Sequence, residues 1–491
     1  MARVPPPLSR VPAPPVQPAE QPAEQPAPGA SGAPAVPAAL PVLRVVLVLS
    51  LGAAVSLGLT RFAYALLLPP MRADLGWSYT LAGGMNTANA LGYLLGALAT
   101  PLLLRRLAPG TLLMLGAVLA TLFMALCGFF VDAMPLLLQR TLAGVASAFV
   151  FISGGLMAAR LGASQAGRSG LLVGLYYGGT GWGISASALL VPVVLAQAPG
   201  PHAWAWAWWA LAALCALCSM LLWWPVRVLR RSDAAASAAV FASAAPPGMA
   251  PSPAGAESRG SGSASAELDG CKSCGVPPPA PRMESGHGAG GRHAASAETH
   301  PPANAPAAPL PLRALAPALA GYTLFGVGYI GYMTFVVALL RDAGMSGGAV
   351  TWFYALLGLA VVLSPRLWAG LLERSRGGQA LALLCALLGV ATVLPAITVA
   401  WPVVLFSGLL FGGVFLSLVA STTALVRHNL APAQWAAGIS AFTIVFAFGQ
   451  IVGPTVVGAI ADGPGGLARG LWLSGGALWL GALLAVRQRP L

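Results

Sequence analysis

Two arginines lie inside long apolar stretches, where a charged side chain is costly. Arg61 belongs to LGLTRFAYALLLPPMRADLGWS, residues 57–78, and Arg140 belongs to LLLQRTLAGVA. A charge at the centre of a membrane helix costs at least about 2.5–3.5 kcal/mol, and such residues usually face a bundle interior or a wet cavity. At a rise of 1.5 Å per residue, both would lie roughly 9–12 Å below the same membrane boundary.

No acidic residue is placed to neutralise these two arginines. The nearest acids lie at the ends of the apolar stretches or in loops: Asp74, Asp132, Asp342, Glu373 and Asp462. Two cations at one depth without a protein anion suggest that an anion arrives from outside, such as a carboxylate, phosphate or sulfonate. The alternative is that each arginine hydrogen-bonds carbonyl and amide groups between helices. We favour anion contact for Arg61, whereas the position of Arg140 also suits a structural role.

Several aromatic and amide side chains could line the same cavity. Some of them would, in any helical bundle, simply bond from helix to helix. The predicted substrate-binding set consists of the two arginines together with Tyr64, Asn86, Asn89, Tyr177, Trp182, Tyr329, Tyr332 and Gln450.

Motifs for metals, cofactors or catalysis are weak. Cys271-x-x-Cys274, with His287 and His293 downstream, is only loosely similar to a zinc site, because the second pair is poorly spaced and the surroundings are low in complexity. The sequence has no GxxxxGK[ST] loop for direct ATP drive. A membrane-embedded enzyme would need clustered His, Asp or Glu at membrane depth. We therefore expect no metal, no cofactor and no enzymatic activity.

Composition indicates a polytopic membrane protein. Of 491 residues, 57% are hydrophobic and only 8% are charged, and the mean hydropathy is +0.78, whereas soluble domains carry roughly 25% charged residues. The net charge of +13 does not indicate nucleic-acid binding, because the basic residues sit in short loops between apolar runs.

Twelve stretches are long enough to span a bilayer, which takes about 20 apolar residues. We predict an all-α fold of two six-helix bundles, with a disordered cytoplasmic tail (1–40), an N-terminal bundle (41–226), a disordered cytoplasmic linker (227–311) and a C-terminal bundle (312–491). The predicted spans are 43–68, 79–101, 110–131, 134–158, 169–195, 203–226, 314–340, 348–371, 379–399, 402–426, 434–460 and 467–486.

Arginine also predicts the orientation. With the N-terminus inside, the outer loops hold only Arg72, Arg341 and Arg469, and the inner loops and flanks hold most of the others. This asymmetry places both termini in the cytoplasm. We expect a multi-pass protein of the bacterial inner membrane.

The stretch around Arg61 recurs in the second half as GVGYIGYMTFVVALLRDAGMS, residues 326–346. Arg61 falls opposite Tyr329, so the two halves share a frame but not the charge. The matched pairs at constant offset are Gly58 with Gly326, Tyr64 with Tyr332, Asp74 with Asp342, Gly76 with Gly344, and Ser78 with Ser346.

The chain resembles the major facilitator superfamily, and within it the YbfB/YjiJ-type branch. The segments that carry this resemblance are GLTRFAYALLLPPMRADLGWS with AGGMNTANALGYLLGAL, LYYGGTGWGIS, GYTLFGVGYIGYMTF and FAFGQIVGPTVVGAIAD. It covers essentially everything outside 1–40 and 227–311. The resemblance implies alternating access about a central cavity lined by helices one, four, seven and ten.

The chain departs from the superfamily pattern in its charged loops. The loop between helices two and three usually carries an Asp-Arg pair, but here Arg105 and Arg106 stand without the acid. The equivalent loop after helix eight keeps Glu373 and Arg374, so the resemblance implies a one-sided gating network.

Glycine-rich helices complete the predicted gating and structural set. Helix four keeps an R-x-x-x-G spacing from Arg140, and helix eleven keeps G-x-x-x-G-P, whereas the glycine-rich helix five lacks the proline. Small residues at this spacing let helices approach closely and, in both halves, favour helices that rock against each other. The residues are Gly144, Gly178, Gly449, Gly453 and Pro454.

We therefore expect a monomeric secondary active transporter that moves a small organic solute across the bilayer. We favour an anionic solute. A coupling proton is kept as a second transported partner, because a proton could travel on a weakly acidic solute. Alternatives are an exporter of lipophilic or drug-like compounds and a membrane sensor or scaffold whose linker binds a partner.

Overall fold

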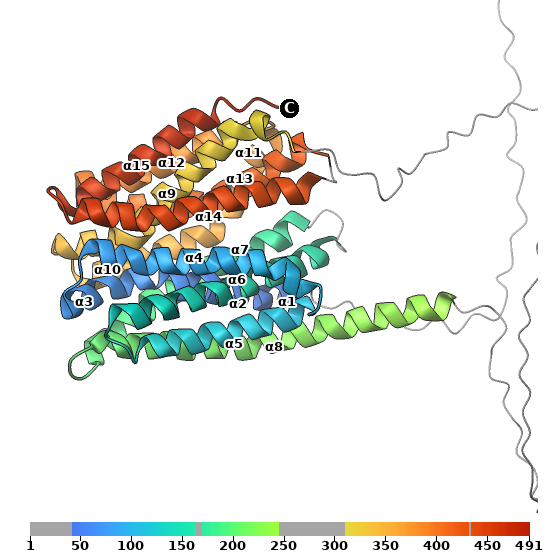
Figure 1. Ribbon diagram of the computed structural model, residues 1–491, viewed down its shortest axis with the longest axis horizontal. Coiled ribbons are helices and arrows are strands. Elements are labelled where there is room, and N and C mark those ends of the chain that lie inside the picture. The colour runs from blue at the N-terminus through green and yellow to red at the C-terminus, as the bar shows by residue number, and fades with distance from the viewer. Residues whose placement is uncertain (1–41, 164–168, 245–309, 432–433) are drawn as a thin grey trace, which may run out of the picture. The chain divides into compact units, whose positions relative to one another are not determined.

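The computed structural model describes residues 42–163, 169–244, 310–431 and 434–491. These residues form helices and no strand. Figure 1 shows their arrangement, and in chain order they are α1 (Val42–Leu49), α2 (Leu51–Ala53), the π-helix η1 (Ala54–Phe62), α3 (Tyr64–Leu75), α4 (Tyr79–Leu104), α5 (Pro109–Cys127), α6 (Ala133–Ala163), α7 (Ser169–Gln197), α8 (Ala203–Ala244), α9 (Leu312–Asp342), α10 (Gly347–Leu367), α11 (Ala369–Arg374), α12 (Gln379–Ile397), α13 (Trp401–Asn429), α14 (Trp435–Ala461) and α15 (Gly466–Ala485).

The helices provide twelve spans in the described part of the chain. The first span, Val42–Leu75, combines α1, α2, η1 and α3, and the eighth, Gly347–Arg374, combines α10 and α11. Each span is apolar enough and long enough to cross a membrane. The predicted all-α fold with twelve membrane helices is confirmed.

The helices gather into two halves, α1–α8 and α9–α15, which Figure 1 separates by colour. Within the first half α6 packs on α4 and α5, and within the second half α9 packs on α14 and α15. The halves meet through α4 against α14, α7 against α10, and α3 against α9. The first and seventh spans, which carry the repeated segment in α3 and α9, therefore lie where the halves meet.

Matched positions of the repeat adopt matched conformations. Gly76 and Gly344 both end their helices in the left-handed region, with φ of 64° and 80°, which glycine adopts without steric cost. Ser78 and Ser346 then cap the next helices, accepting hydrogen bonds from Leu81 N at 3.1 Å and from Ala349 N at 3.3 Å.

The bundle has two ends, which we name after a residue at each. The Tyr79 end is where α3 stops and α4 begins, and it also holds the end of α14. The Arg105 end is where α4 stops and α5 begins.

The helix that precedes the predicted linker is longer than the sequence suggested. Residues 227–244, predicted as the start of the disordered linker, continue α8 to Ala244, since their alanine-rich run has a high helix propensity. The predicted tail and the linker from residue 245 to 309, with Cys271 and Cys274, lie outside the described residues.

Candidate functional site

Arg61 lies in an unusual segment of helix one. The chain is wound as a π-helix from Ala54 to Phe62, and Ala63 N donates to Gly58 O five residues earlier at 3.0 Å. π-turns are rare and frequently mark functional sites. The wide turn ends at the arginine that the sequence singled out.

Close packing and hydroxyl bonds hold this π-helix. A Cβ atom on Gly58 would lie 2.6 Å from Gly183 Cα, so α7 crosses η1 where neither residue has a side chain. On the opposite side, Ser56 Oγ donates to Ser147 O at 2.7 Å, and Thr60 Oγ1 lies 2.7 Å from Ser147 Oγ. The segment is thus fixed between α7 and α6.

Arg140, on α6, bonds protein groups through both of its Nη atoms, while its buried Nε has no partner among the described residues. Its Nη1 donates to Thr60 O at 2.5 Å and its Nη2 to Asn86 Oδ1 at 3.1 Å. The guanidinium carbon lies 5.0 Å from the Tyr64 ring centre and 5.5 Å from that of Trp208, within the range of cation–π attraction. Arg140 therefore links its own helix, α6, to η1, α3, α4 and α8 of the first half.

Three other predicted residues support this arrangement. Asn89 Nδ2 donates to the Arg140 carbonyl at 3.1 Å, and the Tyr64 hydroxyl donates to a backbone carbonyl of α4 at 2.9 Å. Asn86 Nδ2 reaches across to Thr334 Oγ1 of the second half at 2.8 Å. These side chains hold helices together around Arg140.

Arg61 is equally buried but unbound. Its residue is 2% exposed, and among the described residues its Nε and Nη2 have no hydrogen-bond partner. It lies within electrostatic range of Tyr93, Tyr329 and the Arg140 guanidinium. A buried guanidinium without an acceptor is expensive, so a ligand that supplies one would relieve the cost.

An aromatic cluster of the second half lies within electrostatic range of Arg61 through Tyr329. Tyr329 stacks on Phe325 at 4.9 Å, on Phe415 at 5.1 Å and on Phe446 at 5.5 Å between ring centres. Tyr93 brings a smaller cluster from the first half, with Phe151 at 6.3 Å. Arg61 thus lies within electrostatic range of one tyrosine from each half.

The remaining predicted aromatic and amide residues divide by position. Tyr177 belongs to the Tyr93 cluster, 5.0 Å from Phe151. Tyr332 stacks on Phe411 at 4.1 Å and its hydroxyl bonds to a serine of α13 at 2.8 Å. Gln450 is buried on α14 at the contact with α9.

Trp182 is not brought to the site. Its side chain is 49% exposed, and it shares one face of α7 with the exposed apolar residues Leu171, Leu189 and Val193. The residues next to it in the chain, Gly181 and Gly183, make the close contacts of α7. This placement gives Trp182 the outer face of the bundle.

The predicted gating charges lie at the surface of the Arg105 end. Arg105 and Arg106 follow α4, while Glu373 and Arg374 end α11, and all four are exposed. Within the described residues none of them forms an ion pair. The structure does not show the gating network that the resemblance implied.

The predicted small residues sit at helix crossings. A Cβ on Gly144 would lie 2.1 Å from Asn89 O, and one on Gly449 or Gly453 would lie 2.3 or 2.6 Å from carbonyls of α9. A Cβ on Gly83 would lie 2.3 Å from Pro454 O, which belongs to the other half. A Cβ on Gly178 would lie 3.6 Å from the nearest atom, which is on α10.

A capping contact between the halves was missed by the sequence analysis. Asp462, just after α14, accepts hydrogen bonds from Tyr79 N at 2.7 Å, Thr80 N at 2.9 Å and Thr80 Oγ1 at 2.6 Å. Burial raises the pKa of the Asp462 carboxyl, but the hydrogen bonds from Thr80 and Tyr79 outweigh it and hold the pKa below its usual value. The Tyr79 hydroxyl also donates to Asp342. We call this set the Asp462 clamp.

Further contacts between the halves lie deeper in the bundle. Thr87 Oγ1 donates to Ile451 O at 2.7 Å, and the Tyr354 hydroxyl donates to Phe62 O at 2.8 Å, at the end of the π-helix. In the sequence Thr87 and Tyr354 are ordinary helix residues, so no signal there distinguished them.

The twelve-helix fold is similar to the folds of solved membrane transporters. The computed structure is similar to the "Crystal Structure of A Bacterial Homolog to Human Lysosomal Transporter, Spinster, in Inward-facing And Unoccupied Conformation", with 13% identity, a TM-score of 0.56 and coverage of 91% of this chain and 98% of that chain. It is also similar to the "Crystal structure of nucleoside transporter NupG", with 11% identity, a TM-score of 0.57 and coverage of 91% and 99%. At such low identity, both likenesses show the fold alone.

The family follows from the sequence. The family model described as "Uncharacterised MFS-type transporter YbfB" matches residues 53–250 and 289–486, and no curated protein matches the chain. The chain belongs to this YbfB-type family of major facilitator superfamily transporters, as the resemblance predicted.

Proposed function

We propose that this protein is a secondary active transporter of a small organic anion, whose negative charge is bound by Arg61. The observation that carries the proposal is the buried guanidinium whose Nε and Nη2 lack an acceptor. The acidic residues of the described spans, Asp74, Asp342 and Glu373, lie at the ends of those spans, and none of them is placed to neutralise it. A carboxylate offers two acceptor oxygens in the geometry that a guanidinium fork favours.

The occupation of Arg140 narrows the class of anion. Both of its Nη atoms bond protein acceptors and only its Nε lacks one, whereas Arg61 lacks an acceptor at both Nε and Nη2, so Arg61 is the better placed to meet a solute. One free guanidinium favours a solute with a single carboxylate over a dicarboxylate. The adjoining aromatic residues favour an apolar or aromatic body.

The contacts between the halves support alternating access. The bonds of the Asp462 clamp and of Thr87 join α4 to α14 toward the Tyr79 end. In the proposed cycle these contacts break when that end opens and form again when it closes. The arginine distribution supports an orientation in which the Tyr79 end is the outer one and both termini lie in the cytoplasm, with the protein in a bacterial inner membrane. The protein acts as a monomer, and any coupling proton would be carried by the solute.

Thermal stabilisation of the purified protein tests the solute class. The probes are benzoate, succinate, glucose and the lipophilic cation tetraphenylphosphonium. We expect the largest stabilisation from benzoate, and we expect Arg61→Gln to lose it, because a neutral amide cannot replace the charge. Stabilisation by the cation alone would overturn the anion assignment and favour export of lipophilic compounds.

Uptake into proteoliposomes tests the role of Arg61 in transport. We expect Arg61→Ala to abolish uptake of labelled benzoate while insertion and folding persist. Arg366→Ala is the matched control, because Arg366 is an exposed arginine near the Arg105 end of α10 and should leave uptake intact. Full uptake by Arg61→Ala would refute the proposal.

A further inference from the structure

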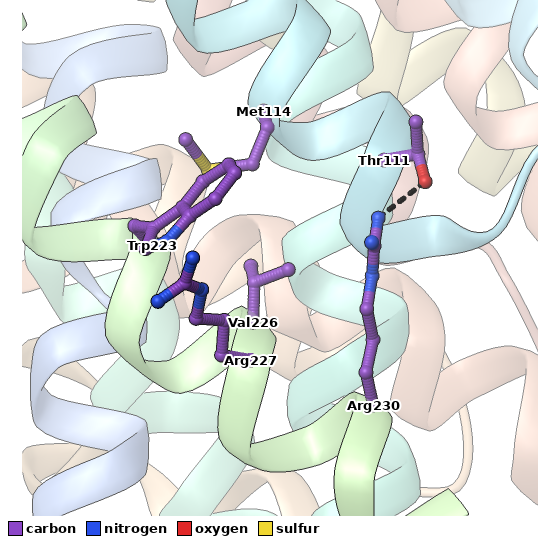
Figure 2. A pocket seen from close by; sticks show the side chains of 6 residues that line it. All are labelled: Thr111, Met114, Trp223, Val226, Arg227 and Arg230. Carbon is purple, nitrogen blue, oxygen red and sulfur yellow. Dashed lines mark hydrogen bonds between the residues drawn. The ribbon is translucent and has the colours of Figure 1, made fainter. Parts of the chain in front are cut away.

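A recess at the Arg105 end combines basic and apolar walls. It has a volume of about 440 Å³ and lies between the start of α5 and the middle of α8. Figure 2 shows its six lining side chains, which are Thr111, Met114, Trp223, Val226, Arg227 and Arg230. This recess is separate from the Arg61 site and takes no part in the proposed transport step.

The positive charges of the recess are held in place. Arg230 Nη2 donates to Thr111 Oγ1, the bond drawn in Figure 2. The Arg227 guanidinium carbon lies 4.7 Å from the ring centre of Trp223. Both arginines are exposed, and their spacing of three residues puts them on one side of α8. Their remaining N–H groups can meet a phosphate.

The apolar residues lie deeper along the same helices. Trp223 precedes Arg230 by seven residues on α8, about 10 Å along the axis. Trp223 is 48% exposed and lies beside Met114 in Figure 2, away from the pair formed by Thr111 and Arg230. Tryptophan favours the level of the lipid headgroups. The charges lie toward the end of the membrane span Ala203–Ser232 and the apolar surface lies further inside it, which matches the order of groups in a phospholipid.

We propose that this recess binds one anionic phospholipid, with the phosphate on Arg227 and Arg230 and the glycerol and upper acyl chain against Trp223 and Met114. Basic pockets between membrane helices are suited to such headgroups. The second recess at this end, formed by Leu102, Leu103, Arg105 and Arg106, has the same charge but neither an aromatic nor a hydroxyl side chain.

Native mass spectrometry of the full-length protein tests the proposal. The lipids are phosphatidylglycerol and, as the zwitterionic comparison, phosphatidylcholine with the same acyl chains. We expect Arg227→Gln/Arg230→Gln to weaken phosphatidylglycerol binding about 30-fold, which is about 1 kcal/mol for each arginine. If the double variant does not fold, Arg227→Gln alone should weaken it about fivefold, on the same scale.

Controls make the result specific to this recess. Arg105→Gln/Arg106→Gln removes the same charge from the second recess and should have a much smaller effect. An equal loss in that control, or equal binding of the two lipids by the unmodified protein, would overturn the proposal. Inorganic phosphate should not displace the lipid, since it lacks the apolar part, and displacement by it would instead indicate a site for free phosphate.

Discussion

Replacing Asp462 by asparagine should favour opening at the Tyr79 end. The carboxylate of Asp462, which follows α14, accepts from Tyr79 N and Thr80 N at the start of α4, so it acts as the helix cap of the opposite half. A cap contributes about 0.5–2 kcal/mol, and a negative charge at a helix N-terminus adds about 0.3–1 kcal/mol. Because Asp462 is exposed, we expect a change of about 1–2 kcal/mol, or about 5–30-fold in the ratio of closed to open protein.

Distance measurement between two spin labels can detect this change. Ala73 and Val399 are exposed at the Tyr79 end, one in each half, and would carry the labels in a protein whose six cysteines are replaced. Asp462→Asn should increase the population with a long distance. Asp132→Asn is the matched control, since Asp132 is exposed at the same end. Unchanged distances in both Asp462→Asn and Asp462→Ala would refute the capping argument.

Acid should act on the clamp in the same direction as the mutation. The hydrogen bonds hold the pKa of Asp462 below its usual value, so the clamp has its full strength above the ordinary aspartate pKa of about 3.9. Its contribution is lost as the pH falls through the lowered value. Asp342 bonds the Tyr79 hydroxyl and Arg72 lies 3.8 Å from that ring, so these groups also face the clamp. Opening should therefore begin only below about pH 4.

Two further predictions separate structural residues from the solute site. Arg140→Ala should lower the free energy of unfolding by about 2–6 kcal/mol, because two buried acceptors lose their donor at about 1–3 kcal/mol each, whereas Arg61→Gln should leave it unchanged or raised. Thermal unfolding in detergent checks both, and equal losses would contradict the distinction between them. Trp182→Ala should leave uptake of labelled benzoate intact, because Trp182 lies on the outer face of α7, and a loss of uptake in folded protein would show that this face takes part.

The length and apolar composition of each stretch predicted the spans, because a membrane span needs little else. The sequence also showed Gly76 and Gly344, and Ser78 and Ser346, as matched pairs of the repeat, and the structure gives the glycines left-handed backbone and the serines the role of helix caps. These features depend on residues close together in the chain. Local physics is sufficient for them.

The different roles of Arg61 and Arg140 could not be predicted from residues close together in the chain. Arg61 and Arg140 have similar depth and similar neighbours in the sequence, and the sequence kept anion contact and a structural role open for each. The structure separates them because Asn86 and Thr60 approach Arg140 from other helices. For the same reason Tyr93, which comes within electrostatic range of Arg61 only in the folded bundle, was missed. Trp182 was assigned to the cavity because a helix face cannot be chosen without knowing what packs on either side.

The π-helix explains why Arg61 is suited to connect binding with motion. Its end is held by the first half through the bond from Arg140 to Thr60 O and by the second half through the bond from Tyr354 to Phe62 O. Arg61 lies in the chain between those two carbonyls. An anion drawn to Arg61 would therefore act on a segment that both halves hold, and through Tyr329 it would also act on the aromatic cluster of the second half. In the proposed cycle, a single charge contact at this point is enough to make closure of the halves depend on the solute.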